Sequence, residues 1–128
     1  MGLLEVKTYT LTTDASGNAS TSTPDQSRTA HINGFIETVE VVYEDGVPST
    51  CNLVITSNTP SDTILSLTEN NTSGVWRPRD LVHTNDGVQQ VASVGLERFA
   101  VAGPLTITVS GGGDTKMIKV RVIYQRRF

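Results

Sequence analysis

The amino-acid sequence predicts an all-β protein: a two-sheet antiparallel β-sandwich of about eight strands, in one domain over residues 1–128. Three observations carry this prediction. Apolar and polar residues alternate along most of the chain, turn-forming residues recur roughly every ten positions, and no segment has the apolar spacing of an amphipathic helix. A jelly roll is the favoured arrangement, and an immunoglobulin-like sandwich is the alternative, because sequence spacing does not set strand order.

The first half of the chain contains five expected strands, at 3–13, 19–23, 28–43, 50–57 and 63–68. The second of these is short and polar and ends before Pro24, which favours a place at a sheet edge. In the third, Phe35, Val39, Val41 and Tyr43 share one face, and Gly34 is the expected site of a bend or bulge. In the fourth, alternation places Cys51 with its neighbours Leu53 and Ile55 on the buried face.

The second half begins with a short strand near 75–79 and an irregular stretch over 80–95, followed by expected strands at 96–101, 104–110 and 115–124. The last two strands alternate most regularly. We expect Gly111–Gly113 and Asp114 to join them in a tight hairpin. Within the final strand, one face should meet the core and the other carries Lys119 and Arg121. The core-facing residues are Ile118, Val120, Val122 and Tyr124.

The charge distribution gives no reason to expect binding to nucleic acid and leaves assembly with other proteins as one interpretation. The net charge is −3 at pH 7, which creates no field that attracts a polyanion. Acidic residues gather between Glu37 and Asp45, whereas the chain is purely basic from Lys116 onward. Two oppositely charged edges would suit packing between neighbouring molecules, and solvated strand faces explain the same pattern equally well. No apolar run reaches the length of a membrane span, and no secretory signal is evident.

Residues able to perform chemistry are few, so we expect no enzymatic activity, cofactor or metal ion. His83, oriented by Asp80 or Asp86, is the one conceivable general base, and an exposed loop histidine is the simpler interpretation. Cys51 is the single cysteine, which excludes an internal disulfide, and its neighbours predict a buried thiol. Neither Glu44–Gly46 nor Asn85–Gly87 completes the ligand spacing of a calcium loop.

Trp76 raises the question of carbohydrate binding, because sugar sites commonly use an exposed aromatic ring. Five of the aromatic residues fit inward strand positions: Tyr9, Phe35, Tyr43, Phe99 and Tyr124. This leaves Trp76, beside Arg77 and Arg79, and Phe128 for other roles. Anchoring the core or an interface is the interpretation of Trp76 that we favour.

An ordered set of motifs resembles a family of small virion structural proteins of tailed bacteriophages. The resemblance covers nearly the whole chain. Its motifs are Val6–Asn18, Asn33–Ile36, Glu44–Gly46, Trp76–Arg79, Glu97–Leu105 and Val109–Lys116. The C-terminal sequence Gln125–Phe128 departs from the family, whose members commonly end on an acidic strand.

The resemblance implies a capsid decoration, or cement, protein with a jelly-roll core. Such a protein is made in the host cytoplasm, lies on the capsid exterior, binds the major capsid protein and acts as a homo-oligomer, a dimer or a trimer. Alternatives are a carbohydrate-binding or host-adhesion module of the virion and a small tail or neck component. The candidate partner-interface residues are Trp76, Arg77, Arg79, Lys119, Arg121, Arg126, Arg127 and Phe128. The basic tail with its terminal aromatic ring is a candidate anchor, and no nucleic acid or membrane is expected as a partner.

Overall fold

A computed structural model describes residues 3–21, 31–58, 60–81, 87, 89 and 96–126. This part of the chain forms ten strands and contains no helix. The strands are β1 (Leu4–Thr12), β2 (Ala19–Ser20), β3 (His31–Tyr43), β4 (Asn52–Asn58), β5 (Ser61–Leu67), β6 (Gly74–Trp76), β7 (Asp80–Leu81), β8 (Leu96–Glu97), β9 (Ala100–Ser110) and β10 (Met117–Arg126). The prediction of an all-β protein is therefore confirmed.

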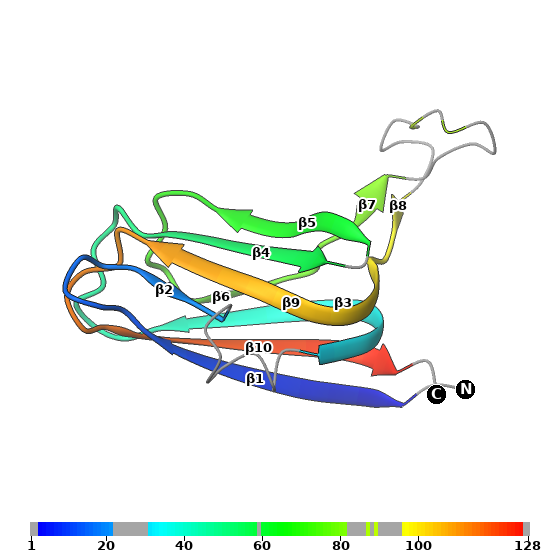
Figure 1. The fold of residues 1–128 in the computed structure, drawn as a ribbon, viewed down its shortest axis with the longest axis horizontal. Coiled ribbons are helices and arrows are strands. Elements are labelled where there is room, and N and C mark those ends of the chain that lie inside the picture. Colours follow the sequence, from blue (N-terminus) through cyan, green and yellow to red (C-terminus); the bar gives the residue numbers. More distant parts are fainter. Residues whose placement is uncertain are drawn as a thin grey trace.

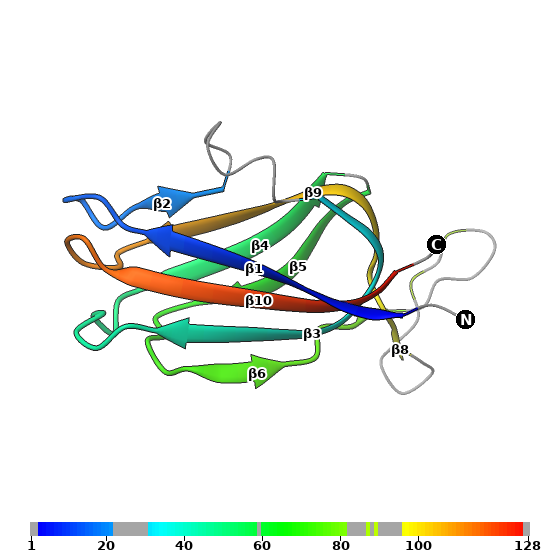
Figure 2. The ribbon, with the colours of Figure 1, turned by 90° about the horizontal axis from the view of Figure 1, so that it is seen from below.

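Eight of these strands form two four-stranded antiparallel layers (Figures 1 and 2). The first layer has the order β1-β10-β3-β6. The second layer has the order β2-β9-β4-β5. β7 and β8 pair separately and project from one end of the sandwich-like body.

The two layers are joined because β3 and β9 each contribute to both. The first part of β3, residues 31–35, pairs with residues 100–104 of β9. Beyond this point β3 continues beside β10 and β6, whereas β9 continues beside β4 and β2. Gly103 and Pro104 lie where β9 passes from one layer to the other, so this pair marks a bend inside a single strand. The expected break between strands 96–101 and 104–110 is wrong for that reason.

One hydrophobic core fills the space between the layers. Alternation supplies it, because every second residue is buried along β4, from Leu105 to Ser110 in β9 and from Met117 to Tyr124 in β10, while the residues between are more exposed. Complete burial of a Val, Leu or Ile side chain contributes roughly 1.5–3 kcal/mol. The largest fully buried side chains are Leu11, Ile32, Ile36, Val39, Val41, Leu53, Ile55, Val101, Leu105, Ile107, Val109 and Ile118. The predicted inward faces of β4 and β10 are therefore confirmed.

The expected hairpin between the last two strands is wrong. β9 pairs with β2, β3 and β4, whereas β10 pairs with β1 and β3, so the glycine-rich connection crosses between the layers. Thr13 holds this crossing in place: its Oγ1 donates to the Gly113 carbonyl at 2.6 Å and accepts from the Lys116 amide at 2.7 Å. The Gly112 amide donates to the carbonyl of Gly17 in the β1–β2 turn at 3.0 Å.

Candidate interaction surface

The outward face of the β1-β10-β3-β6 layer carries most of the exposed large apolar side chains among the described residues. Among the described residues, seven large hydrophobic residues are exposed, and five of them lie on this face. These five are Leu4, Val6, Val42, Val75 and Met117. We refer to the outward side chains of these four strands as the outer face.

An ion pair occupies the middle of the outer face. The strand register places Thr8, Arg121, Glu40 and Val75 in one row across all four strands. Arg121 Nη1 lies 2.8 Å from Glu40 Oε1, so the two charges compensate each other within the sheet. A cross-strand pair of this kind contributes at most about 1 kcal/mol at an exposed site. The neighbouring row carries Lys119, opposite Val42.

A β-bulge in β3 shapes one end of the outer face. Tyr124 of β10 pairs with Ile36 and Ile123 pairs with Thr38, so Glu37 is the additional residue. Ile36 and Val39 are both fully buried, and the two residues between them both stay out of the core. The bulge therefore directs the Glu37 carboxylate toward the neighbouring loops. In a regular strand, Glu37 and Thr38 would point to opposite faces of the sheet, and one of them would enter the core.

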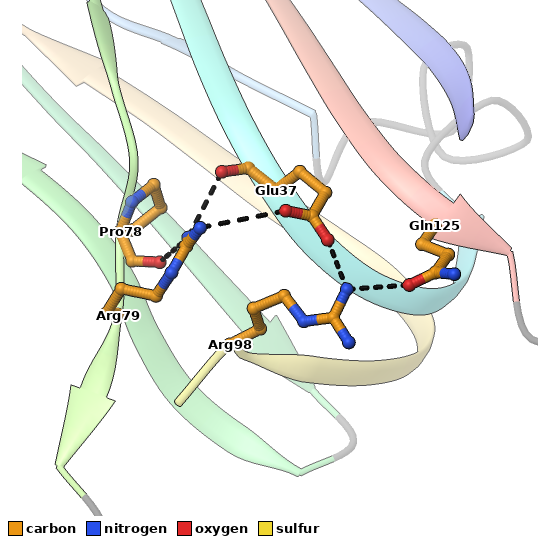
Figure 3. Close-up of polar contacts among 5 residues, drawn as sticks. All are labelled: Glu37, Pro78, Arg79, Arg98 and Gln125. Atoms are coloured by element: carbon orange, nitrogen blue, oxygen red, sulfur yellow. Dashed lines mark hydrogen bonds and ion pairs between the residues drawn. The ribbon is translucent and has the colours of Figure 1, made fainter. Parts of the chain in front are cut away.

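Two arginines from separate loops converge on Glu37 (Figure 3). Arg79 follows β6 and donates to the Glu37 carbonyl at 3.1 Å, and its Nη2 lies 3.7 Å from Glu37 Oε2. Arg98 follows β8 and forms an ion pair with Glu37 Oε1. Arg98 also donates to Gln125 Oε1 at 2.6 Å and lies over the Phe35 ring, 4.6 Å from its centroid. This cluster, Glu37–Arg79–Arg98–Gln125, ties β3 and β10 to the chain on either side of the β7–β8 pair.

The same bulge explains why Phe35 is not in the core. Phe35 pairs with Gln125 and lies between the buried residues Gly34 and Ile36, so its ring lies toward the outside and is half-buried. The prediction of an inward Phe35 is wrong, because the parity of β3 changes at Glu37. Beside the ring is a pocket of about 220 Å³, lined by Phe35, Pro60, Asp62, Asp80, Glu97, Arg98, Phe99 and Ala100. The other predicted inward aromatics, Tyr9, Tyr43, Phe99 and Tyr124, are buried.

The candidate interface residues fall into several places. Lys119 and Arg121 lie on the outer face, and Arg79 belongs to the cluster at its end. Trp76 faces inward opposite Val39 and packs against the core, with its ring over Gly74. Arg77 is exposed beside it. This geometry places Trp76 in a packing role, as favoured from the sequence.

The first half of the C-terminal sequence Gln125–Phe128 belongs to the sheet. Gln125 and Arg126 belong to β10, where Arg126 Nη1 lies 3.1 Å from Glu5 Oε1 and the Arg126 amide donates to the Leu3 carbonyl at 3.0 Å. Removing residues 125–128 would therefore damage the sheet. Arg127 and Phe128 lie outside the described residues.

Separate acidic and basic edges, one of the two interpretations of the charge pattern, are not found among the described residues. β3 and β10 are neighbours, so the acidic segment of one meets the basic segment of the other. Glu40 pairs with Arg121, and Glu44 Oε2 lies 3.9 Å from Lys116 Nζ. Charges that are distant in sequence compensate each other on one sheet.

The residues considered for chemistry are not brought together in the described structure. His83 and Asp86 lie outside the described residues, and Asp80 lies in β7. Cys51 is fully buried, and this burial raises the pKa of its thiol, which disfavours the reactive thiolate. Within the described ranges, no group of three or more His, Cys, Asp and Glu side chains could hold a metal ion. No helix in that part of the chain is long and apolar enough to cross a membrane.

Comparisons with known proteins place the chain in no family. No protein-family model matches it, and no curated protein matches its sequence. Among solved structures, it is similar to a crystal structure of FLHE over 96% of this chain and 98% of that chain. The TM-score is 0.48 and the sequence identity is 12%, so no functional inference is transferred.

Sequence reasoning missed Glu37, Arg98 and Gln125 as a group. The parity change in β3 was visible, because Ile32 and Ile36 occupy even positions whereas Val39, Val41 and Tyr43 occupy odd ones. That change signals a bulge between residues 36 and 39. The partners of the bulged glutamate come from distant segments, and no local pattern identifies them.

Proposed function

We propose that this protein is a structural binding module, a decoration protein of a tailed-bacteriophage capsid, and that its outer face binds the major capsid protein. The observation that supports this proposal is the gathering of five exposed apolar side chains on one sheet face. Exposed apolar side chains that gather on one face of a small protein favour that face as a site of protein contact. The virion role itself rests on the motif resemblance described above.

The composition of the outer face suits binding with little loss of conformational entropy. Its exposed side chains include Val6, Val42 and Val75, together with the β-branched threonines of β1. Such side chains have few rotamers to lose on contact, and a sheet holds them in fixed positions. The Glu40–Arg121 ion pair lies among them with its charges already matched. An unpaired charge at the same place would carry a larger desolvation penalty on contact.

We infer that the sandwich is a jelly roll. In that topology, eight strands form two sheets. The first strand lies at the edge of its sheet and pairs with the last strand. The second strand pairs with the next to last. Leaving β7 and β8 aside, the orders β1-β10-β3-β6 and β2-β9-β4-β5 support this reading. The glycine-rich crossing between β9 and β10 is the connection that such an arrangement requires.

The proposal is tested by adding the purified protein to capsids of the phage that encodes it and locating it by cryo-electron microscopy. The informative variant is Val42→Asp, which replaces an exposed apolar side chain of the outer face with a charge, in the row next to the Glu40–Arg121 pair. We expect it to weaken capsid binding at least roughly tenfold, because a carboxylate would be desolvated on contact.

Leu96→Asp is the matched control, since Leu96 is similarly exposed but lies in β8, away from the outer face. It should bind capsids as the unmodified protein does. Wild-type binding by Val42→Asp would exclude the outer face as the contact surface. Failure of the unmodified protein to bind capsids, or its location on the tail, would exclude the decoration role.

A further inference from the structure

β1 is an edge strand, and its free side borders the outer face. Among the described strands, β1 pairs with β10 alone, so it is the terminal strand of its layer (Figure 1). Two backbone contacts fix which residues point toward β10. The Leu3 carbonyl accepts from Arg126, and the Thr13 amide donates to Lys116. Odd-numbered residues of β1 therefore bond to β10, and even-numbered residues direct their amides and carbonyls to the free edge.

The N-terminal half of this edge is the accessible part. Leu4 and Val6 are 66% and 57% exposed, and both direct their backbone groups to the free side. At the other end of the strand, β2 lies nearby, since Thr12, Ala19 and Ser20 help to line one pocket of about 410 Å³. An exposed strand edge with apolar side chains is a template for pairing with another strand.

We propose that β1 pairs antiparallel with β1 of a second copy of this chain, with Val6 on the two-fold axis. The charges of the strand select both the partner and the register. Glu5 and Lys7 lie on the same side of β1, and with Val6 on the axis Glu5 of each copy lies opposite Lys7 of the other. Shifting the axis to Glu5 or to Lys7 places like charges opposite each other, and shifting it to Thr8 leaves Lys7 without a facing carboxylate. Glu5 keeps its contacts to Arg126 and Tyr124 within its own chain in every register.

In the proposed register, the apolar side chains of the two copies also meet. Val6 lies opposite Val6, and Leu4 lies opposite Thr8, all on the outward side of the sheet. Val6 has its amide and carbonyl directed to the free edge, so the two copies exchange two hydrogen bonds at the axis. Pairing would extend the β1-β10-β3-β6 layer into one eight-stranded sheet across the dimer. This assembly concerns the protein alone and does not depend on the capsid partner proposed above.

The first test is the oligomeric state of Val6→Pro and Thr10→Pro, measured by light scattering across the accessible concentration range. Both substitutions remove an amide that faces the free edge, so neither disturbs the bonds to β10. Val6→Pro should raise the dimer dissociation constant by roughly tenfold or more, because each copy loses a donor to the other. Thr10→Pro lies outside the paired segment and should dimerise as the unmodified protein does.

A covalent trap tests the register without relying on the proline variants. Facing residues of a hydrogen-bonded antiparallel pair have Cα atoms about 5.5 Å apart, which a disulfide can span. Mild oxidation should therefore cross-link Val6→Cys into a dimer. Two Thr10→Cys side chains would lie roughly 27 Å apart along the strands and should not cross-link. The natural Cys51 is fully buried and does not compete.

Three results would overturn the proposal: a monomeric unmodified protein at every concentration, equal effects of Val6→Pro and Thr10→Pro, or no cross-linking of Val6→Cys. All of these are measured on the purified protein without capsids. They leave the proposed capsid binding to be decided by its own experiment.

Discussion

At Gly34 the backbones of β3 and β10 approach so closely that no side chain fits between them. A Cβ atom added to Gly34 would lie 2.0 Å from the carbonyl oxygen of Gln125. Because the obstacle is backbone, it cannot rotate away, and the strands must separate. We expect Gly34→Ala to lower the free energy of unfolding by roughly 2–4 kcal/mol, measured by denaturant titration.

Gly74→Ala is the matched control for this prediction. The added Cβ would meet the Trp76 ring at 3.1 Å, and this half-buried side chain can shift at the sheet edge. It should therefore destabilise the fold less than Gly34→Ala. Equal losses in the two variants would mean that the close approach at Gly34 is not the controlling contact.

The buried tyrosines make stability sensitive to alkaline pH. Burial raises the pKa of Tyr124 to about 12, with further contributions from its hydrogen bond to Glu5 and the nearby carboxylate charge. Burial also raises the pKa of Tyr9. The folded state therefore binds more protons than the unfolded state above the ordinary tyrosine pKa of about 10. Stability should be unaffected by these groups below pH 10 and fall between about pH 10 and 12.

The measurement for this prediction is the denaturation midpoint as a function of pH, for the unmodified protein and for Tyr124→Phe. The phenylalanine variant has no phenol to ionise at this position, so its stability should fall less steeply across the same interval. Parallel curves for the two proteins would contradict the assignment to Tyr124.

Among the elements, β1 predicts unequal losses of stability for proline at two adjacent positions. The Lys7 amide points to β10 and the Val6 amide points to the free edge, by the alternation set out above. Lys7→Pro should cost roughly 1–3 kcal/mol of stability, because a β10 carbonyl loses its donor. Val6→Pro should cost less in the monomer. The stability of both variants is measured by thermal unfolding at a concentration too low for self-association. A larger loss for Val6→Pro than for Lys7→Pro would mean that the Val6 amide, and not the Lys7 amide, points to β10.

The elements also show what alternation can and cannot predict. The inward faces of β4 and β10 followed directly from the sequence, because each strand keeps one parity along its length. The strands that pair with β9 could not be predicted from alternation. The three glycines after Ser110 allow a tight hairpin and a crossing between layers equally well. The crossing is selected by Thr13 and Gly17, about a hundred residues away in sequence.

The candidate surface was predictable to a similar extent. Lys119 and Arg121 were placed on the outward side of the last strand, and they lie there. That Arg121 meets Glu40 depends on β3 being the neighbour of β10, which the sequence does not state. The convergence of Arg79 and Arg98 on Glu37 required both the bulge and the β7–β8 excursion.

On the scale of the whole molecule, the two layers should unfold as one unit. They share a single core, and β3 and β9 run through both of them. Far-ultraviolet circular dichroism reports the strands of both layers, and Trp76 fluorescence reports the packing of β6 against the core. We expect the two signals to change with one coincident midpoint in denaturant. Two resolved midpoints would show that the layers are independent.

The passage of β3 and β9 through both layers has a mechanical consequence. Sliding one layer sideways over the other would strain covalent backbone and shear the pairing of residues 31–35 with 100–104, in addition to displacing side chains in the core. A lateral load on one surface is thus carried across the thickness of the molecule by continuous chain. A protein of this construction, bound between two neighbouring molecules that move sideways relative to each other, would deform little under the shear force.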